Sequence, residues 1–160
     1  MFRIGYGEDI HKFAQGRKLF LCGIEIPFEL GLEGHSDADV ALHALSDALL
    51  SSLALGDIGK YFPPEDDSIE GIDSKIILKK CYEMVLKKGY KLTNATIFII
   101  AEKPKLKKYI LDMRSSIANV MKVDEELIAV SAGTNEGLDE IGRGKGIKCV
   151  ANVLVERADI

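Results

Sequence analysis

The final segment of the chain, residues 147–156, is apolar at almost every position, and this pattern constrains the fold more than any other feature. A strand points successive side chains to opposite faces of its sheet, so one-sided burial would leave Val150 and Leu154 in water. We expect helices to cover one face of the sheet and other subunits to pack against the second, because large exposed apolar patches usually mark association. The alternative is a monomer with helices on both faces.

Turn and capping residues divide the rest of the chain into strands and helices. Ser36 is the predicted N-cap of the first long helix and Gly56 its stop, while Asp73 and Gly89 bound the second helix. The predicted strands are 2–9, 18–25, 92–101, 127–131 and 147–156, and the predicted helices are 36–55, 74–88 and 106–121. This order predicts an α+β fold with a mixed β-sheet, in a single domain over residues 1–160 and without an internal repeat.

Composition and charge exclude several classes of protein. With 160 residues, of which 47% are hydrophobic, the chain can bury one core but not two. A net charge of −4 argues against a nucleic-acid partner. Cys22, Cys81 and Cys149 form no C-x-x-C pair, so we expect reduced thiols. The apolar runs are too short for a membrane span and the chain starts with strand-like sequence, so we expect a cytoplasmic protein without a signal segment or membrane partner.

All three histidines fall within the first 43 residues, beside carboxylates. Asp9 and His11 stand two apart in strand-like sequence, so their side chains share one face. With His43, about two turns into the first helix, they could give a divalent ion two imidazole nitrogens and one carboxylate oxygen, a set that suits zinc best. Asp39 or Asp47, one turn to either side, could hold the second ring nitrogen of His43. The alternatives are histidines in ordinary hydrogen bonds and a solvated acidic helix face.

A second group, residues 131–137 and 142–146, combines glycines with a hydroxyl and a carboxylate where a strand ends. Glycines let backbone amides approach an anion closely, Thr134 can donate to a phosphate oxygen, and Glu136 can hold a Mg²⁺ that bridges phosphates. A plain flexible loop is the alternative. The lysine-rich segment 101–108 starts a helix after a proline, and on composition alone a solvated helix start is a better interpretation than a nucleic-acid patch.

The motifs, taken in order, resemble one enzyme family along essentially the whole chain. They are Gly5-x-Gly7-x-Asp9-x-His11, Ile26-Pro27, residues 34–45, 47–50 and 54–59, Asp73-Ser74, Pro104-Lys105, Thr134-x-Glu136 and Gly142-Arg143-Gly144. In this order they resemble the 2-C-methyl-D-erythritol 2,4-cyclodiphosphate synthase family. The resemblance implies a ferredoxin-like variant fold, with helices packed on one face of the sheet, and a homotrimer whose sheets face the three-fold axis.

The same resemblance implies a metal-dependent phosphorus-oxygen lyase of non-mevalonate isoprenoid precursor biosynthesis. Such an enzyme converts 4-diphosphocytidyl-2-C-methyl-D-erythritol 2-phosphate to the 2,4-cyclodiphosphate and releases CMP. The 2-phosphate of the substrate is the nucleophile, so the protein acts through positioning and charge stabilisation. By motif position the metal ligands would be Asp9, His11 and His43 for Zn²⁺, and Glu136 for Mg²⁺ or Mn²⁺ held with the substrate diphosphate. The residues that stabilise the transition state would be His35 and Thr134.

The other substrate contacts that the resemblance implies fall into four groups. The phosphate contacts are Asp9, His11, His35 and Ser36. The methylerythritol contacts are Asp57, Ile58 and Gly59, under a mobile loop of Phe62, Pro63, Pro64, Glu65 and Asp66. The cytidine pocket, given by a neighbouring subunit, is Ala101, Glu102, Lys103, Pro104, Lys105, Leu106, Lys107, Gly133, Thr134, Asn135 and Glu136, which reverses the solvated interpretation of the lysines. The anion site on the trimer axis is Arg143, with Glu140 nearby.

The chain departs from the family pattern at a few positions. Cys22 replaces a usual glycine, and Ser51-Ser52 replaces a Gly-Ala pair. In the ligand pockets Pro64 stands for a frequent aspartate and Gly133 for a frequent threonine. Asp139-Glu140 replaces a Gly-Phe pair near the axis, which puts charge where the family has an aromatic ring, so we do not predict regulation from that site.

Two rival functions belong to other classes. A metal-dependent phosphatase or phosphodiesterase would use the same ligands but would give inorganic phosphate or an open-chain product. A non-catalytic trimer would bind cytidine nucleotides without turnover. Product analysis separates both from the synthase.

Overall fold

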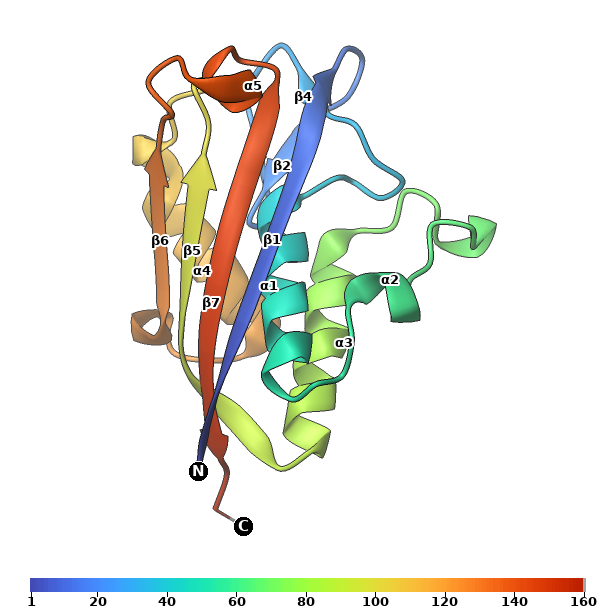
Figure 1. The fold of residues 1–160 in the computed structure, drawn as a ribbon, viewed down its shortest axis with the longest axis vertical. Coiled ribbons are helices and arrows are strands. Elements are labelled where there is room, and N and C mark those ends of the chain that lie inside the picture. Colours follow the sequence, from blue (N-terminus) through green and yellow to red (C-terminus); the bar gives the residue numbers. More distant parts are fainter. Residues whose placement is uncertain (160) are drawn as a thin grey trace.

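A twisted sheet organises the molecule (Figure 1). The computed structural model describes residues 1–159. Five strands lie in the order β4-β1-β7-β5-β6, with bounds Gly31–Leu32, Phe2–Ala14, Gly146–Arg157, Tyr90–Ile100 and Ile128–Gly133. β5 and β6 run parallel and the other neighbours run antiparallel, so the sheet is mixed, as predicted. Two further strands, β2 (Leu19–Leu21) and β3 (Ile24–Ile26), pair as a separate hairpin.

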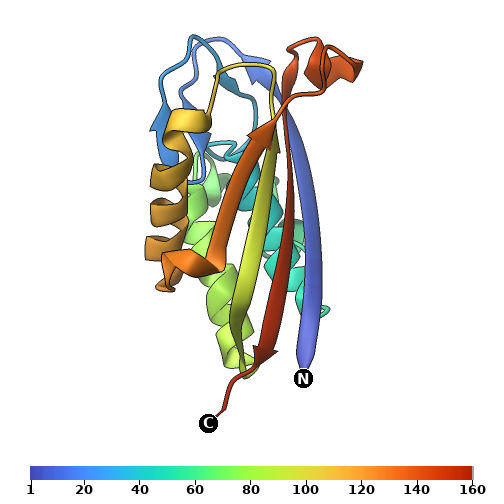
Figure 2. The same cartoon turned by 90° about the vertical axis from the view of Figure 1, so that its left-hand side faces the viewer.

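Helices cover one face of this sheet. The three long ones are α1 (Val40–Ser52), α3 (Ser74–Lys87) and α4 (Ile110–Met121), and the two short ones are α2 (Ile58–Tyr61) and α5 (Asp139–Gly142). All three long helices lie on the same side of the strands in Figure 2, and the part of the chain that the structure describes places no long helix on the other side. The predicted α+β fold is therefore confirmed, and the alternative with helices on both faces is wrong.

One hydrophobic core fills the space between the sheet and the helices. On β7 the inward residues Ile147, Cys149, Ala151 and Val155 are fully buried, in the alternation that a strand imposes. α1 is buried on nearly every side because it lies between the sheet and α3. Side chains from the start of this helix are therefore held rigidly against β1.

Two glycines allow α1 to approach β1 closely. A Cβ atom on Gly5 would lie 2.0 Å from the carbonyl oxygen of Ala48, and one on Gly7 would lie 2.2 Å from that of Ala44. Both distances are far below van der Waals contact, so a larger residue at either position would have to displace the helix. Asp9 continues on the same face of β1 and meets the first turn of α1.

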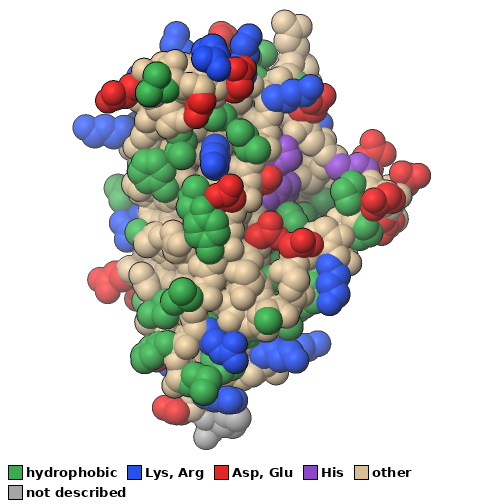
Figure 3. All heavy atoms as spheres, viewed as in Figure 1, with side chains coloured by type: hydrophobic (Ala, Val, Ile, Leu, Met, Phe, Trp, Pro, Cys, Tyr) green, Lys and Arg blue, Asp and Glu red, His purple; other side chains and the backbone are tan. Residues whose placement is uncertain are grey.

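The outer face of the sheet is open and carries several exposed apolar side chains. Ile4, Tyr6 and Ile10 on β1 are each more than half exposed, and Phe98 on β5 is 42% exposed. Across the strands Ile4 pairs with Leu154, and an ion pair between Glu8 and Lys148 lies among the apolar side chains on the same face. Figure 3 shows hydrophobic side chains along this side of the molecule. No helix within residues 1–159 is long and apolar enough to span a membrane.

The predicted start of the first helix is wrong. The N-cap is Asp39 rather than Ser36, and the helix begins at the next residue. The Asp39 carboxylate also accepts the backbone N–H groups of Cys22, at 3.0 Å, and Gly23, at 2.7 Å, so it joins the helix to the β2–β3 turn. His43 therefore lies in the first turn of α1 and not two turns into the helix.

The other element boundaries differ by a few residues. The predicted strand 18–25 is the β2–β3 hairpin, which turns where Cys22 has φ +56°. Because this left-handed backbone favours glycine, the cysteine occupies a position that glycine adopts more easily. α1 ends at Ser52 rather than near residue 55, and α4 begins at residue 110 after a 3₁₀ turn over Lys107–Tyr109. Asp73 caps α3, as predicted.

Candidate metal and phosphate site

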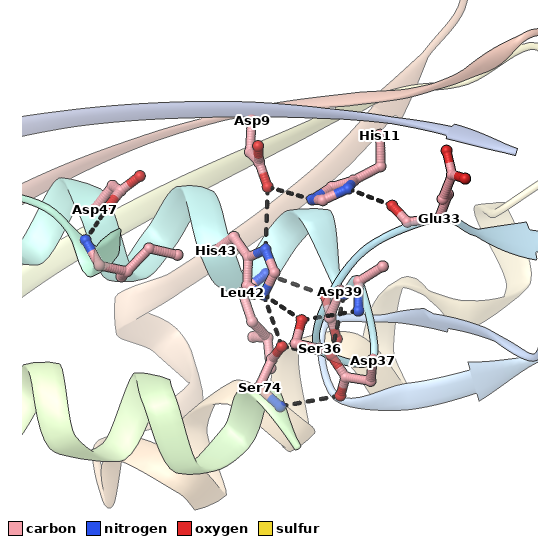
Figure 4. A network of polar contacts seen from close by, with 12 residues as sticks. Asp9, His11, Glu33, Ser36, Asp37, Asp39, Leu42, His43, Asp47 and Ser74 are labelled. Atoms are coloured by element: carbon pink, nitrogen blue, oxygen red, sulfur yellow. Dashed lines mark hydrogen bonds and ion pairs between the residues drawn. The ribbon is translucent and has the colours of Figure 1, made fainter. Parts of the chain in front are cut away.

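Asp9, His11 and His43 converge at the inner face of the sheet (Figure 4). Asp9 Oδ2 lies 2.8 Å from His11 Nε2 and 3.1 Å from His43 Nδ1. One ligand atom from each of the three residues can be chosen so that all lie within 4.8 Å of one another. Two imidazole nitrogens and a carboxylate oxygen form a donor set that fits a divalent metal ion and leaves a coordination position for substrate.

The backbone determines how His11 presents its ring. His11 Nδ1 lies 2.7 Å from the carbonyl oxygen of Glu33, which can only accept, so Nδ1 carries the hydrogen. His11 Nε2 then faces Asp9 and can bind an ion through its lone pair. A backbone partner of this kind is the usual way in which a metal-binding histidine is oriented.

Charge stabilises the cluster without an ion. Burial raises the pKa of Asp9, but its polar contacts with the rings of His11 and His43 outweigh it and lower that pKa to about 2. Burial lowers the pKa of His11, but the hydrogen bond to Asp9 outweighs it and the pKa is raised. A proton on His11 Nε2 therefore occupies the position of a metal ion, and the two compete for the same site.

The hypothesis that an aspartate of α1 holds His43 is wrong. The Asp39 carboxylate caps the helix, and Asp47 accepts the backbone N–H of Ile58 at 2.8 Å. The second ring nitrogen of His43 instead lies 2.9 Å from Ser74 Oγ and 3.1 Å from Ser36 Oγ. Ser74 is not among the expected site residues, although Asp73-Ser74 is one of the motifs that resemble the family.

A pocket of about 360 Å³ opens beside this cluster, and we call it pocket one. Its lining contains ten of the expected site residues: Asp9, His11, His35, Ser36, His43, Asp57, Ile58, Gly59, Phe62 and Pro64. The other lining residues are Asp47, which was expected only as a partner of His43, and Ile69, Ile72 and Ile77, which were not expected. Expected loop residues Pro63, Glu65 and Asp66 are not among the lining residues, although His35 Nε2 lies 3.4 Å from the Asp66 carbonyl oxygen.

A short helix forms one wall of pocket one. Asp57 caps α2 by accepting the N–H of Lys60 at 3.1 Å. Asp47 accepts the N–H of Ile58 and so fastens the start of α2 to α1. Burial raises the pKa of Asp47. Residues 58–61 therefore form a short helix that is capped by Asp57 and fastened to α1.

A second pocket, of about 460 Å³, lies at the end of β5 and β6, and we call it pocket two. Its expected lining residues are Ala101, Pro104, Lys105, Leu106, Lys107, Gly133 and Thr134. Its further lining residues are Ile110, Val130, Ser131 and Ala132. A Cβ atom on Gly133 would lie 2.9 Å from Phe98 Cζ, so the glycine avoids a clash with that ring.

Glu102 organises the loop beside pocket two. Its carboxylate accepts the backbone N–H groups of Asn135, at 2.9 Å, and Gly137, at 3.2 Å. Glu136 lies between them with φ +52° and an exposed side chain, and its N–H donates to Thr134 Oγ1 at 3.2 Å. Glu102, Lys103, Asn135 and Glu136 are not among the lining residues of pocket two.

Pockets one and two share no lining residue among residues 1–159. The structure therefore joins the three ligands with His35 and Ser36, and separately joins the lysine segment with Thr134. Arg143 lies apart from both pockets, and its guanidinium is paired with the Glu140 carboxylate.

Comparison with known proteins gives consistent results. The family model described as the YgbB family matches residues 2–156. Among curated relatives, the 2-C-methyl-D-erythritol 2,4-cyclodiphosphate synthase of Brachyspira hyodysenteriae is 53% identical over 145 residues, covering 91% of this chain and 92% of that protein. A solved 2C-methyl-D-erythritol-2,4-cyclodiphosphate synthase in its CDP-bound form aligns with a TM-score of 0.88 at 38% identity, over 96% of this chain and 100% of that one. The bifunctional IspDF of Campylobacter jejuni aligns with a TM-score of 0.96 at 38% identity over 99% of this chain, which spans 43% of that longer protein.

Proposed function

The chain belongs to the YgbB family, together with the 2-C-methyl-D-erythritol 2,4-cyclodiphosphate synthases, and from that premise we propose how its residues carry out the reaction. The reaction converts 4-diphosphocytidyl-2-C-methyl-D-erythritol 2-phosphate to 2-C-methyl-D-erythritol 2,4-cyclodiphosphate and releases CMP. It is a phosphorus-oxygen lyase step of non-mevalonate isoprenoid precursor biosynthesis. The observation that carries the proposal is the convergence of Asp9, His11 and His43 beside pocket one.

Two divalent ions are part of the proposal. Asp9, His11 and His43 would hold Zn²⁺, since two imidazoles and one carboxylate suit that ion, and Glu136 would hold Mg²⁺ or Mn²⁺ with the substrate diphosphate. When bound, the ions neutralise charge on the phosphates and polarise their oxygens. The exposed Glu136 carboxylate is free to reach a ligand outside its own loop.

The bond changes require no nucleophile from the protein. An oxygen of the substrate 2-phosphate attacks the β-phosphorus, the bond from that phosphorus to the bridging oxygen breaks, and CMP leaves with the electron pair. The protein must hold the attacking and leaving groups in line and stabilise the charge that develops. His35, on the rim of pocket one, and Thr134, in pocket two, are the proposed donors to the transferred phosphate.

The two pockets would receive different parts of the substrate. The wall formed by α2, with Asp57, Ile58 and Gly59, would bind the methylerythritol hydroxyls, under the loop from Phe62 to Asp66. Pocket two would bind the cytidine, with residues 101–107 and 133–136 around it. The solved CDP-bound synthase supports a cytidine nucleotide as the ligand.

We propose a homotrimer because the two pockets are separate within one chain. If a neighbouring subunit places its pocket two beside pocket one, both halves of the site meet, and the apolar outer faces of the sheets are buried against each other around the axis. The ferredoxin-like arrangement, the single domain over residues 1–160 and the cytoplasmic location belong to this proposal. Because Arg143 is paired with Glu140, the proposal includes no anion bound by Arg143 on the trimer axis.

The activity is tested by following CMP and the cyclic product with and without a chelator. Purified, metal-loaded protein should form both products in equal amounts, and the chelator should abolish the reaction. Phosphorus NMR distinguishes the cyclic diphosphate from inorganic phosphate or an open-chain product, either of which would favour a phosphatase or phosphodiesterase instead.

The shared site is tested by co-producing two inactive variants, His43→Ala and Thr134→Ala. Each variant inactivates a different pocket, so a site is active only when one subunit gives an intact pocket one and its neighbour an intact pocket two. Random mixing in a trimer should therefore restore about a quarter of the wild-type activity. No restoration, with mixed oligomers present, would show that both pockets must come from one chain.

A further inference from the structure

His43 makes polar contacts at both ring nitrogens, and only one of them faces the other metal ligands (Figure 4). Nδ1 points toward Asp9, whereas Nε2 points away from the cluster toward Ser74 and Ser36. A neutral imidazole carries hydrogen on one nitrogen and a lone pair on the other. The partners of Nε2 therefore determine whether Nδ1 can bind an ion.

Ser74 settles which nitrogen carries the hydrogen. Its hydroxyl is hydrogen-bonded to Asp37 Oδ1, and because a carboxylate only accepts, the single hydrogen of the hydroxyl is committed to Asp37. The Ser74 oxygen, 2.9 Å from His43 Nε2, can then only accept from that nitrogen. This places the hydrogen on Nε2 and leaves the lone pair on Nδ1.

Asp37 is itself held firmly. Its Oδ2 accepts the backbone N–H of Ser74 at 3.0 Å, and its Oδ1 accepts that of Asp39 at 3.1 Å. Ser74 is the first residue of α3 and is fully buried, so the carboxylate lies where the helix dipole favours negative charge. Ser36 also contacts His43 Nε2, but its hydroxyl can either donate or accept there, so this contact does not favour either tautomer of His43.

We propose that Asp37 and Ser74 form a positioning pair that fixes the Nε2–H form of His43 and thereby aims its Nδ1 lone pair at the metal ion. The pair acts through His43, by the same principle that the Glu33 carbonyl oxygen applies to His11. The inference rests on the proposed metal centre and adds to it the residues that orient one of its ligands.

Zinc affinity, measured by competition with a chromophoric chelator, tests the pair. Ser74→Ala removes the acceptor. Asp37→Asn places an amide N–H against the backbone N–H of either Asp39 or Ser74, and so disturbs the group that accepts the Ser74 hydrogen. Each should weaken zinc binding by about 10–100-fold, the usual cost of losing such a partner. Ser74→Thr keeps the hydroxyl and should bind close to wild type. Asp73→Asn is the matched control, because it preserves the cap of α3 next to Ser74.

The ring itself provides a readout that a merely structural role would not change. Long-range proton–nitrogen NMR of the zinc-loaded wild type should show His43 with hydrogen on Nε2 and Nδ1 bound to the ion; a His43→Gln sample assigns the signals. Coordination through Nε2 would overturn the proposal, and this measurement needs no variant to fold. Wild-type affinity in both Ser74→Ala and Asp37→Asn would overturn it as well.

The failure of the pair can be distinguished from failure of the metal centre. If the wild type binds no divalent ion, the proposal of a metal centre is wrong, and the proposal of a positioning pair is wrong as well. If the wild type binds zinc but the folded variants bind equally well, only the pair is wrong. Weaker binding that Ser74→Thr does not restore, with the His43 signals unchanged, would show a structural role and would also refute the inference.

Discussion

Pocket one and pocket two differ in how much of their structure one chain supplies. In pocket one both ring nitrogens of His11 and of His43 have partners, and the candidate metal ligands come from β1 and the first turn of α1. In pocket two Thr134 belongs to a loop whose neighbouring Glu136 is exposed. The first pocket is preorganised by the core of the chain, whereas the second presents groups outward, as a site that contacts a ligand across a subunit boundary would.

The largest effect should come from removing a ligand in pocket one. His43→Ala deletes one of two imidazoles, and because the ion would stabilise the transition state by several kcal/mol, the rate should fall by about 10³-fold or more. Metal content of the purified protein should fall with it, while circular dichroism should be unchanged. If His43→Ala were active without metal, pocket one would not be the site that binds the ion, and the difference drawn between the two pockets would be wrong.

A smaller effect should follow in pocket two. Thr134→Ala removes one proposed donor to the transferred phosphate and should lower kcat by about 10²-fold. Zinc bound at pocket one should remain at the wild-type level, since the pockets share no lining residue. Ser131→Ala, in the lining of the same pocket, is the matched control and should keep most of the activity. Loss of zinc in Thr134→Ala would mean that the pockets are coupled.

Acid should affect metal binding at pocket one. The pKa of His11 is raised in the folded protein, and the proton sits on the nitrogen that faces Asp9, so it must leave before an ion binds. Below the raised pKa the apparent zinc affinity should fall by about tenfold per pH unit, and above it the affinity should level off. Calorimetric titration across neutral pH measures this slope. An affinity that rises on acidification would contradict the assignment.

The smallest effect is expected outside both pockets. Glu140→Ala breaks an exposed ion pair with Arg143, and such pairs contribute under about 1 kcal/mol. Thermal unfolding should shift by only a few degrees and turnover should stay at the wild-type level. A large loss of turnover would show that α5 belongs to the site, contrary to the separation described above.

Much of the fold could be predicted because its signals are local. The apolar run of β7, the stop at Gly89 and the cap at Asp73 depend on neighbours in sequence, and the structure has the elements they predict. The start of α1 could not be predicted this way. Ser36 and Asp39 are equally good caps, and the choice is decided by N–H groups at Cys22 and Gly23, which lie far away along the chain.

The site residues also divide into those that local sequence predicts and those that depend on tertiary packing. The spacing of Asp9 and His11 predicts two candidate ligands because a strand has a fixed period, and His43 is the histidine predicted to lie within a helix. Its partners were predicted wrongly, since helical spacing suggested Asp39 and Asp47. The actual partner, Ser74, comes from α3, and only tertiary packing brings it to His43.

The close approach at Gly5 and Gly7 has a consequence for the metal centre. These glycines set the distance between the backbones of β1 and α1, and that distance fixes how far the Asp9 carboxylate lies from the His43 ring. The spacing of these two candidate ligands is thus set by two positions that carry no side chain at all. A single methyl group added at Gly7 would push α1 away from β1. This would lengthen the distance between the Asp9 carboxylate and the His43 ring without changing either residue.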